Sequence, residues 1–368
     1  MTTTLRIVLE RPLDGPGADL GEAARELARG LVATAPSGCD VEAIVPAGAD
    51  DPSGLVPGLR VAPAPALARR ELVTAWQLGL PTGVGGGLIH APSLAAPLIR
   101  HDRVNDHDQT VVTMWDLDAW EHPGDIARAT VVRERALLKR AVRHADAVVV
   151  PTHAMAERLV DIARLGDRIR VIAGAPAEGF RVPSDEVGRR RSLGLPEGFV
   201  LLSGSARASD RLAIGFAAIV AARADLPVVV IDGPEGEEPH IAELAAAAGV
   251  AEGRLHVRPA LDVHDRGAVL GGAVAFLAPA AGSAFPWRLG EALRAGVPVA
   301  AIDTPVHREV LAEGGLLAAD VDELAGALSQ ALGSAAAAER LAVLAADRGR
   351  AFSWLGAAER VWQLHADL

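Results

Sequence analysis

Residues 199–233 read FVLLSGSARASDRLAIGFAAIVAARADLPVVVIDG. Two short apolar runs, FVLLSG and PVVVIDG, enclose a stretch from Leu212 to Ala224 that has the length and apolar spacing of a helix. Strand, helix and strand in this order form the βαβ unit of a parallel sheet, whose strands are continuous aliphatic runs because helices cover both faces. The stretch therefore predicts an α/β fold.

The same alternation continues toward the C-terminus. RLHVRP (254–259), AVAFLAP (273–279) and PVAAID (298–303) predict further strands, and residues 241–248 and 287–295 predict helices between them. The longest apolar run, Gly271 to Gly282, is too short to span a membrane and indicates a buried strand. We therefore predict a complete doubly wound unit in this half of the chain.

Toward the N-terminus a second series of strands is predicted. The runs that predict these strands are LRIVL, DVEAIVP, GLIHAP, TVVTMW, AVVVP and RIRVIAG. A Gly/Pro-rich passage from Gly174 to Gly198 separates this series from the one described above, which indicates two domains. We place the first domain at residues 1–178 and the second at residues 179–350. The carboxyl ends of two such sheets would line an interdomain cleft, where a ligand is expected.

The segment 351–368 is predicted to form a C-terminal helix that packs back across the domains. Its apolar stripe at helical spacing comprises Phe352, Leu355, Ala358, Val361, Trp362 and His365.

Composition narrows the class of protein. The chain has 368 residues, of which 50% are hydrophobic and 23% are charged, which is typical of a globular protein. A formal net charge of −11 argues against nucleic-acid binding. No apolar run is long enough for a membrane span, and MTTTLRIVLERPL lacks the pattern of a secretory signal, so we expect a cytoplasmic protein. Cys39 is the only cysteine in the sequence, which excludes a multi-thiolate metal site. We expect it to be a buried thiol.

Four stretches resemble the actinobacterial branch of retaining, nucleotide-sugar-dependent glycosyltransferases of family 4. They are HAPSLAAPL (90–98), TVVTMWDLDAWEHPG (110–124), HADAVVVPTHAMAERL (144–159) and GEALRAGVPVAAIDTPVHREVL (290–311). The resemblance implies the GT-B architecture, in which two Rossmann-like domains face a cleft. It also implies transfer of a sugar from a nucleoside diphosphate sugar to an acceptor with retained anomeric configuration. No cofactor beyond the nucleotide sugar is implied.

In the first domain the resemblance assigns an acceptor side. Where the family has a Gly-Gly turn after the first strand, this chain has Gly17 followed by Ala18 and Asp19, and Asp19 is expected to cap the next helix. Where the family has Thr-x-His-Asp, this chain has Thr113-Met114-Trp115-Asp116. An indole donates hydrogen bonds but does not accept them, so Trp115 is expected to fill space.

Three further residues are assigned by the same matches. Asp116 is the candidate catalytic residue, and His122, in the family's His-Pro, and His153, in PTH, are candidate acceptor-side residues. The alternative for Asp116 and His122 is that they are solvated loop residues.

In the second domain the resemblance assigns a donor side. The family places a basic pair shortly after a strand and glycine, where it neutralises the donor diphosphate. Here Gly204 is followed by Arg207 and Arg211, while Asp210 falls on one of the pair's positions.

The family's Glu-x7-Glu segment supplies the remaining donor-side candidates. It matches Ser283, Phe285 and Glu291, of which only Glu291 keeps the carboxylate that would bind the nucleotide ribose. The alternative role for Glu291 is a charge at a helix start.

Three functions remain open from the sequence. The first is an active retaining glycosyltransferase. The second is a non-catalytic GT-B protein that binds a glycan or acts as partner of a paralogous glycosyltransferase, which would explain why the Gly-rich turn, the His, the basic pair and the first Glu all differ. The third is another GT-B chemistry, such as a sugar-nucleotide epimerase, which would also need a diphosphate site.

Overall fold

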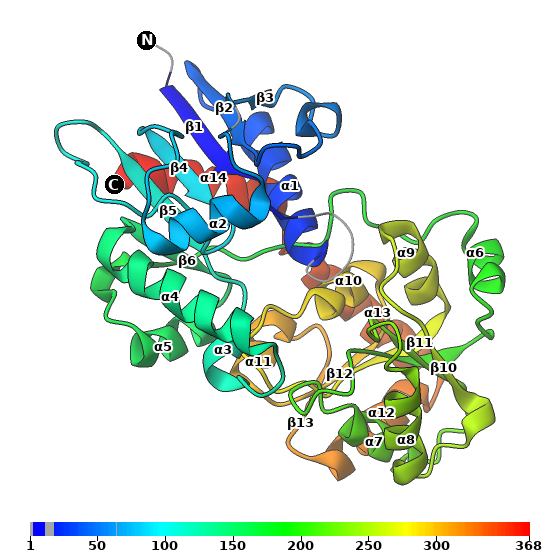
Figure 1. The fold of residues 1–368 in the computed structure, drawn as a ribbon. Coiled ribbons are helices and arrows are strands. Elements are labelled where there is room, and N and C mark those ends of the chain that lie inside the picture. Colours follow the sequence, from blue (N-terminus) through cyan, green and yellow to red (C-terminus); the bar gives the residue numbers. More distant parts are fainter. Residues whose placement is uncertain (1–2, 12–17, 64) are drawn as a thin grey trace. The chain divides into compact units, whose positions relative to one another are not determined.

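The computed structural model describes residues 3–11, 18–63 and 65–368, which form two compact units (Figure 1). The first unit holds the described residues up to Ala177 together with Ser283–Phe285 and Ser353–Leu368. The second unit holds Glu178–Gly282 and Pro286–Phe352. The chain therefore leaves the first unit and returns to it twice.

The described part of the first unit is built on a parallel sheet of seven strands in the order β3-β2-β1-β4-β5-β6-β7. Its strands are β1 (Thr3–Val8), β2 (Cys39–Ile44), β3 (Arg60–Val61), β4 (Leu88–Ala91), β5 (Gln109–Thr113), β6 (Ala147–Val150) and β7 (Ile169–Val171). Its helices are α1 (Ala18–Ala33), α2 (Arg69–Leu78), α3 (Asp118–Glu121), α4 (Arg128–His144), α5 (His153–Ile162) and α14 (Trp354–Asp367), with short 3-10 turns at η1 (Pro52–Gly54) and η2 (Gly166–Arg168).

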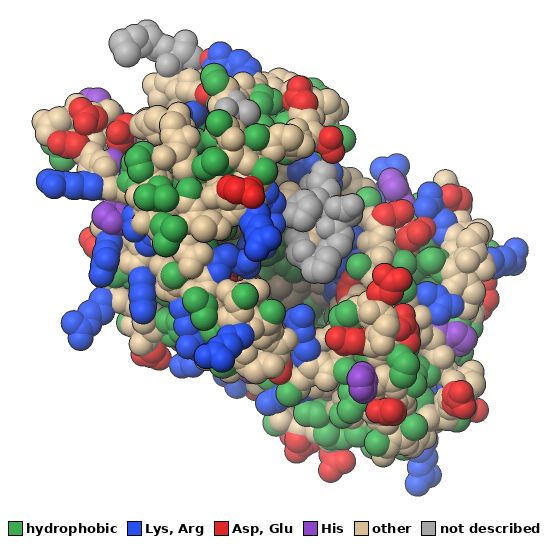
Figure 2. All heavy atoms as spheres, in the orientation of Figure 1, with side chains coloured by type: hydrophobic (Ala, Val, Ile, Leu, Met, Phe, Trp, Pro, Cys, Tyr) green, Lys and Arg blue, Asp and Glu red, His purple; other side chains and the backbone are tan. Residues whose placement is uncertain are grey.

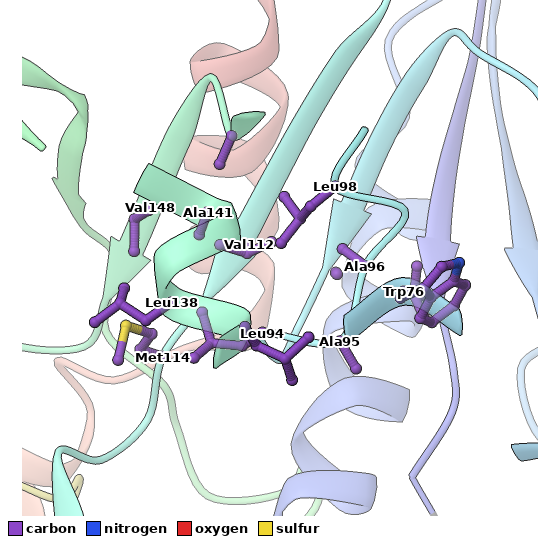
Figure 3. Close-up of a cluster of buried hydrophobic side chains, with 14 of the residues drawn as sticks. Trp76, Leu94, Ala95, Ala96, Leu98, Val112, Met114, Leu138, Ala141 and Val148 are labelled. Carbon is purple, nitrogen blue, oxygen red and sulfur yellow. The ribbon is translucent and has the colours of Figure 1, made fainter. Parts of the chain in front are cut away.

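Aliphatic side chains fill the space between this sheet and its helices. In Figure 3, Val112 of β5 and Val148 of β6 lie against Leu138 and Ala141 of α4, and all four are buried. Helix α14 lies on the opposite face of the sheet from α4. The strands are thus covered on both sides, as continuous apolar strands require.

The second unit repeats the plan, with a described parallel sheet of six strands in the order β10-β9-β8-β11-β12-β13. Its strands are β8 (Phe199–Ser203), β9 (Val228–Ile231), β10 (Leu255–Val257), β11 (Ala273–Ala278), β12 (Val299–Ile302) and β13 (Leu316–Ala318). Its helices are α6 (Glu186–Ser192), α7 (Leu212–Ala221), α8 (Glu238–Ala248), α9 (Val263–Gly272), α10 (Trp287–Ala295), α11 (Pro305–Leu311), α12 (Val321–Leu332) and α13 (Ala335–Gly349), with a 3-10 turn at η3 (Glu252–Arg254).

In both sheets the order in which successive strands are added changes direction beside the first strand. In the first unit the strand order switches between β1 and β4, and in the second unit it switches between β8 and β11. In open α/β sheets ligands bind beyond the carboxyl ends of the strands at such a switch point. Each unit therefore has a defined place in which to look for function.

The structure confirms the predicted strands and corrects several details. The edge strands β3 and β13 were not predicted, because β3 has only two residues and the Leu and Ala residues of β13 are as common in helices as in strands. Leu355 was expected on the buried stripe of the last helix, but it is 38% exposed. Trp354, one position earlier and 4% exposed, takes its place.

One other expectation also changes. Cys39 is half-buried at the start of β2 rather than fully buried. Helix α14 belongs to the first unit, where Trp362 donates its indole N–H to the Leu31 carbonyl of α1 at 3.1 Å. A Cβ at Gly30 of α1 would lie 2.7 Å from the Trp354 carbonyl, so only glycine permits this close approach of the two helices.

Among the helices that the structure describes, none is long and apolar enough to cross a membrane.

Candidate functional site

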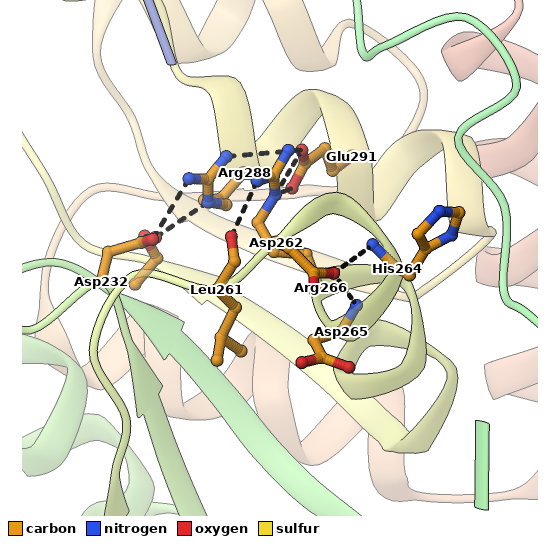
Figure 4. Close-up of polar contacts among 9 residues, drawn as sticks. Asp232, Leu261, Asp262, His264, Asp265, Arg266, Arg288 and Glu291 are labelled. Carbon is orange, nitrogen blue, oxygen red and sulfur yellow. Dashed lines mark hydrogen bonds and ion pairs between the residues drawn. The ribbon is translucent and has the colours of Figure 1, made fainter. Parts of the chain in front are cut away.

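Glu291 lies in a buried network of opposite charges in the second unit (Figure 4). We call Asp232, Arg266, Arg288 and Glu291 the ionic network. Arg266 Nε lies 2.9 Å from Glu291 Oε1 and 3.2 Å from Oε2, and Arg288 Nη1 lies 3.4 Å from Oε1. Arg288 Nε in turn donates to Asp232 Oδ2 at 2.8 Å. Two guanidinium groups thus balance two carboxylates.

The network is positioned by three elements. Asp232 directly follows β9 in the left-handed region, with φ +65°, and its Oδ2 accepts a hydrogen bond from Ser203 Oγ at 2.7 Å. Arg266 comes from α9, and Arg288 and Glu291 from one face of α10 at i and i+3. Burial alone would raise the pKa of Asp232, but the charge and hydrogen bonds of Arg288 outweigh it and lower that pKa below its ordinary value.

The network changes the interpretation of Glu291. Helix α10 begins at Trp287, so Glu291 lies in its second turn and does not serve as a charge at the helix start. The side chain is 3% exposed and both of its oxygens contact Arg266. An incoming ribose hydroxyl would have to share this carboxylate with the arginines.

A short loop follows β8 at the switch point of the second unit. Gly204 has φ +136°, which favours glycine, and a Cβ there would lie 3.1 Å from Asp210. Asp210 Oδ2 accepts hydrogen bonds from Ser205 N and Ser205 Oγ, both at 2.7 Å. The Asp210 carboxylate, which falls on a position of the family's basic pair, is therefore used to hold the loop closed.

Arg207 and Arg211 belong to the same loop and are exposed. Within the part of the chain that the structure describes, neither guanidinium has a hydrogen bond or an ion pair. Arg211 has φ +51° at the N-cap of α7, and its side chain does not cap that helix. Two free positive charges thus lie at the end of β8, where an anionic group would be bound in this fold.

The first unit has a cavity at its own switch point, which we call the Asp116 cavity. Its volume is about 140 Å³. It is lined by residues that follow β1, β4 and β5 and by residues of α3 and α4, among them Arg11, Ser93, Trp115, Asp116, Arg133 and Glu134. The structure thus places Asp116, the candidate catalytic residue from the sequence, at a concave site.

Two carboxyl groups of this cavity hold protons more tightly than usual. Burial raises the pKa of Asp116, and the nearby charge of Glu121 adds to the effect. Burial likewise raises the pKa of Glu134, with Asp116 contributing. Asp116 Oδ1 accepts the Asp118 N–H at 3.2 Å at the start of α3. Carboxyl groups with raised pKa values in a cavity are candidates for accepting or donating a proton.

Trp115 packs in an aromatic cluster beside this cavity. Its ring centroid lies 6.1 Å from that of Phe285 and 6.2 Å from that of Trp354, both edge to face. The indole N–H donates to the Pro92 carbonyl at 3.0 Å, and the Trp115 carbonyl accepts the Phe285 N–H at 2.9 Å. Trp115 therefore fills space.

Ser283 and Phe285, which the sequence assigns to the donor side, are packed within the first unit. Ser283 donates its N–H to Glu121 Oε2 at 3.0 Å and its hydroxyl to Glu121 Oε1 at 2.8 Å. Both polar groups of Ser283 are thus occupied by one carboxylate.

The other predicted residues lie apart from one another. His122 ends α3, with its N–H donated to the Asp118 carbonyl at 2.9 Å, and His153 is an exposed first residue of α5. Gly17 lies outside the described residues. Asp19 lies in the first turn of α1, which begins at Ala18, so the prediction that it precedes the helix as its cap is wrong.

Sequence reasoning missed several residues of these sites. Asp232 had a usable signal, since an acid directly after an aliphatic strand lies at the carboxyl edge of the sheet. Arg266, Glu121 and Glu134 had none, because each lies on a helix whose neighbours are set by tertiary packing.

Part of the chain resembles a family of known sequences. Residues 201–334 match the sequence profile of a family described as Glycosyl transferases group 1. That stretch contains the loop from Gly204 to Arg211, which we call the Gly204 loop, and the whole ionic network. No curated protein sequence matches the chain.

Solved structures resemble the chain over its full length. HepE from Anabaena, solved in complex with UDP and glucose, has a TM-score of 0.71 at 16% identity, covering 100% of both chains. A sucrose-phosphate synthase from Thermosynechococcus elongatus has a TM-score of 0.67 at 19% identity, covering 99% of this chain and 98% of that chain. A glycosyltransferase from Rickettsia africae has a TM-score of 0.64 at 12% identity, covering 100% of this chain and 98% of that chain. The chain has the GT-B fold of glycosyltransferases, which confirms the predicted fold class.

Proposed function

We propose that this protein binds a nucleoside diphosphate sugar and transfers its glycosyl group to an acceptor with retention of anomeric configuration. The Gly204 loop carries the proposal. It combines a glycine with φ +136° at the switch-point end of β8 with two exposed guanidinium groups, Arg207 and Arg211, which have no partner among the described residues. The complexes of HepE with UDP and sugar on the same fold support this choice of ligand.

In this proposal the second unit binds the donor. The C1–O bond of the donor sugar breaks, its electron pair leaves with the diphosphate, and a new C–O bond forms to an acceptor hydroxyl. Arg207 and Arg211 neutralise the charge that develops on the diphosphate. Glu291 accepts a hydrogen bond from the ribose while Arg266 and Arg288 hold its carboxylate in place.

The first unit supplies the acceptor side. Asp116 is half-buried in the Asp116 cavity, and its raised pKa suits a group that takes a proton from the acceptor hydroxyl. Glu134 and Arg133 line the same cavity and set its charge.

A second function is favoured by two specific contacts. Trp115 occupies the position of the family's His and donates its only polar hydrogen to the Pro92 carbonyl, so it cannot relay a proton. Ser283, at the position of the family's first Glu, is held by Glu121. These contacts support a non-catalytic GT-B protein that acts as partner or regulator of an active glycosyltransferase.

Calorimetric titration separates the two functions. The full chain is titrated with UDP, GDP, ADP and their common sugars, with and without a divalent cation, and each ligand that binds is then incubated to detect hydrolysis or transfer of the sugar. Binding followed by release of the nucleoside diphosphate supports the transferase. Binding without turnover supports a non-catalytic protein that keeps its donor site. No binding at millimolar ligand overturns the transferase and supports a non-catalytic protein that acts as a partner.

A further inference from the structure

A second cavity lies in the first unit, and the proposed transfer does not use it. Its volume is about 440 Å³. It is lined by the loop before β5, the end of α4, the residues just before β6 and β7, and Leu368. Apart from Leu368, these segments all precede strands, so the cavity lies at the amino edge of the sheet, opposite the edge that carries the Asp116 cavity. We call it the basic cavity.

His101 and Asp146, two lining residues of the basic cavity, bind each other. His101 Nε2 lies 2.8 Å from Asp146 Oδ2, and His101 Nδ1 lies 3.0 Å from the Ile99 carbonyl. Asp146 Oδ2 also accepts the Thr110 N–H of β5 at 2.8 Å. Both ring nitrogens of His101 face oxygen atoms, and the hydrogen bond to Asp146 raises the pKa of His101. Asp146 is therefore neutralised by His101.

Backbone contacts make the walls rigid. Arg168 Nη1 donates to the Ala145 carbonyl and Nη2 to the Val142 carbonyl, both at 2.8 Å, which satisfies the end of α4. In the loop before β5, Asp102 Oδ1 accepts the N–H groups of Val104 at 2.9 Å and Asn105 at 2.8 Å. The segments that carry the arginines of the cavity are thus held in place before any ligand arrives.

Three arginines of the cavity act on other described groups only through longer-range charge, Arg100 on Asp102, Arg103 on Asp146 and Arg143 on His144. Arg100, Arg103 and Arg143 are exposed, and in the described ranges none of their guanidinium groups has a hydrogen bond or ion pair. Figure 2 shows further Lys and Arg side chains over α4 and α5 on the same unit. The negative end of the α4 dipole explains Arg143, but Arg100 and Arg103 come from a separate loop that has no such end.

The charges of the basic cavity are unbalanced. Besides these three arginines it contains Arg168, whereas Asp167 is its only aspartate without a cationic partner among the described residues. His144 adds no positive charge at neutral pH, because burial and the neighbouring cations lower its pKa. The chain as a whole has a formal net charge of −11, yet in this cavity positive charges lie close together and repel one another. A bound anion would reduce that repulsion.

We propose that the basic cavity binds a small soluble phosphate monoester through Arg100, Arg103 and Arg143. Planar guanidinium groups match phosphate oxygens in pairs, which favours phosphate over a single carboxylate. A cavity of about 440 Å³ has room for a phosphorylated sugar or a similar compound. The site lies at the edge of the sheet opposite the Asp116 cavity, and it does not depend on the proposed transfer.

Calorimetry on the full chain at low ionic strength tests the proposal. Glucose 6-phosphate and inorganic phosphate are the probes, and glucose is the uncharged control. The variant Arg103→Gln/Arg143→Gln is compared with Arg70→Gln/Arg340→Gln, which removes the same charge from exposed arginines outside the cavity. A third variant, Arg207→Gln/Arg211→Gln, reports on phosphate bound at the Gly204 loop.

The expected result is binding of both phosphate probes but not of glucose. The affinity should fall at least about tenfold in Arg103→Gln/Arg143→Gln and stay unchanged in the other two variants. Equal affinity in wild type and Arg103→Gln/Arg143→Gln overturns the proposal. Loss confined to Arg207→Gln/Arg211→Gln also overturns it and assigns the phosphate to the donor loop. If the protein binds phosphatidic acid vesicles but not glucose 6-phosphate, the proposal of a soluble ligand is overturned.

Discussion

Arg266 and Glu291 form a buried ion pair, with Arg266 Nη2 2.9 Å from Glu291 Oε1 and both side chains at most 5% exposed. Buried pairs of this kind are costly to break, because removal of one partner leaves a charge in a medium of low dielectric constant. The pair therefore has a structural role that can be measured apart from any ligand.

Glu291→Ala should lower the free energy of unfolding by about 3–5 kcal/mol, because Arg266 and Arg288 lose the carboxylate between them. Glu243→Ala, on the exposed face of α8, should change it by less than about 0.5 kcal/mol. Urea denaturation measures both. Equal stability of the two variants would show that the ionic network contributes nothing to folding.

The Gly204 loop should not tolerate a side chain at its first residue. Gly204→Ala forces alanine to φ +136° and brings its Cβ to 3.1 Å from Asp210, which should cost about 1–3 kcal/mol. The same variant should weaken binding of UDP. Gly253→Ala is the matched control, since a Cβ there meets nothing within 4 Å. Thermal unfolding and titration with UDP check both effects, and a Gly204→Ala protein as stable as the control would contradict the account of the loop.

Arg207 and Arg211 should act on the diphosphate rather than on the base. Arg207→Gln/Arg211→Gln is expected to weaken UDP binding about tenfold or more and to leave uridine binding unchanged, since each charge-assisted hydrogen bond contributes about 1.5–3 kcal/mol. Competition calorimetry with UDP and uridine gives the comparison. If both ligands weaken equally, the arginines do not bind the diphosphate.

The aromatic cluster should be a major source of stability in the first unit. Trp115→Ala should lower the free energy of unfolding by about 3–5 kcal/mol through lost contacts with Phe285 and Trp354. Trp115→Phe keeps a ring and loses the hydrogen bond to Pro92, so a cost of about 1 kcal/mol is expected. Denaturant titration distinguishes the two, and similar losses would mean that packing of the ring is unimportant.

Acid should destabilise the first unit through two buried histidines. His90 and His365 lie with ring centroids 5.8 Å apart, and their polar contacts are Thr113 Oγ1 at 3.2 Å and Gln109 Oε1 at 2.8 Å. Burial lowers the pKa of His90 and lowers that of His365 to about 4.

The sign of the pH dependence follows from these lowered pKa values. Both rings are neutral in the folded protein above the ordinary histidine pKa of about 6.5, and in that range they impose no penalty. As the pH falls from about 6.5 toward 4, the unfolded chain binds protons that the folded chain excludes. Stability should fall by about 1.4 kcal/mol per pH unit for each ring. Denaturation of His365→Gln should show a shallower slope than wild type, whereas the exposed control His240→Gln should not.

The sequence predicted the strands and the two-sheet plan because that signal is local. Aliphatic runs such as AVVVP and PVVVIDG need no knowledge of their neighbours to be recognised as buried strands. Leu355 was placed wrongly because leucine and tryptophan are equally apolar at adjacent positions, and only tertiary packing, here of the Trp354 ring against Trp115, selects Trp354.

The site was harder to predict because its residues are defined by their partners. Asp210 falls on a position of the family's basic pair, but its carboxylate accepts hydrogen bonds from Ser205, a contact that spacing does not reveal. Likewise Ser283 follows a strand of the second unit in sequence, yet its hydrogen bonds are to Glu121 of the first. A sequence motif names the positions in a site and leaves open which side chains meet there.

The return of α14 to the first unit also sets an order of events during synthesis. Residues 353–368, which cover α1, leave the ribosome after the whole of the second unit. Until then Gly30 and the Leu31 carbonyl of α1 lack the helix that packs on them. A nascent first unit must therefore wait with this surface uncovered, and a fragment that stops after Ala177 should expose it to solvent and to chaperones.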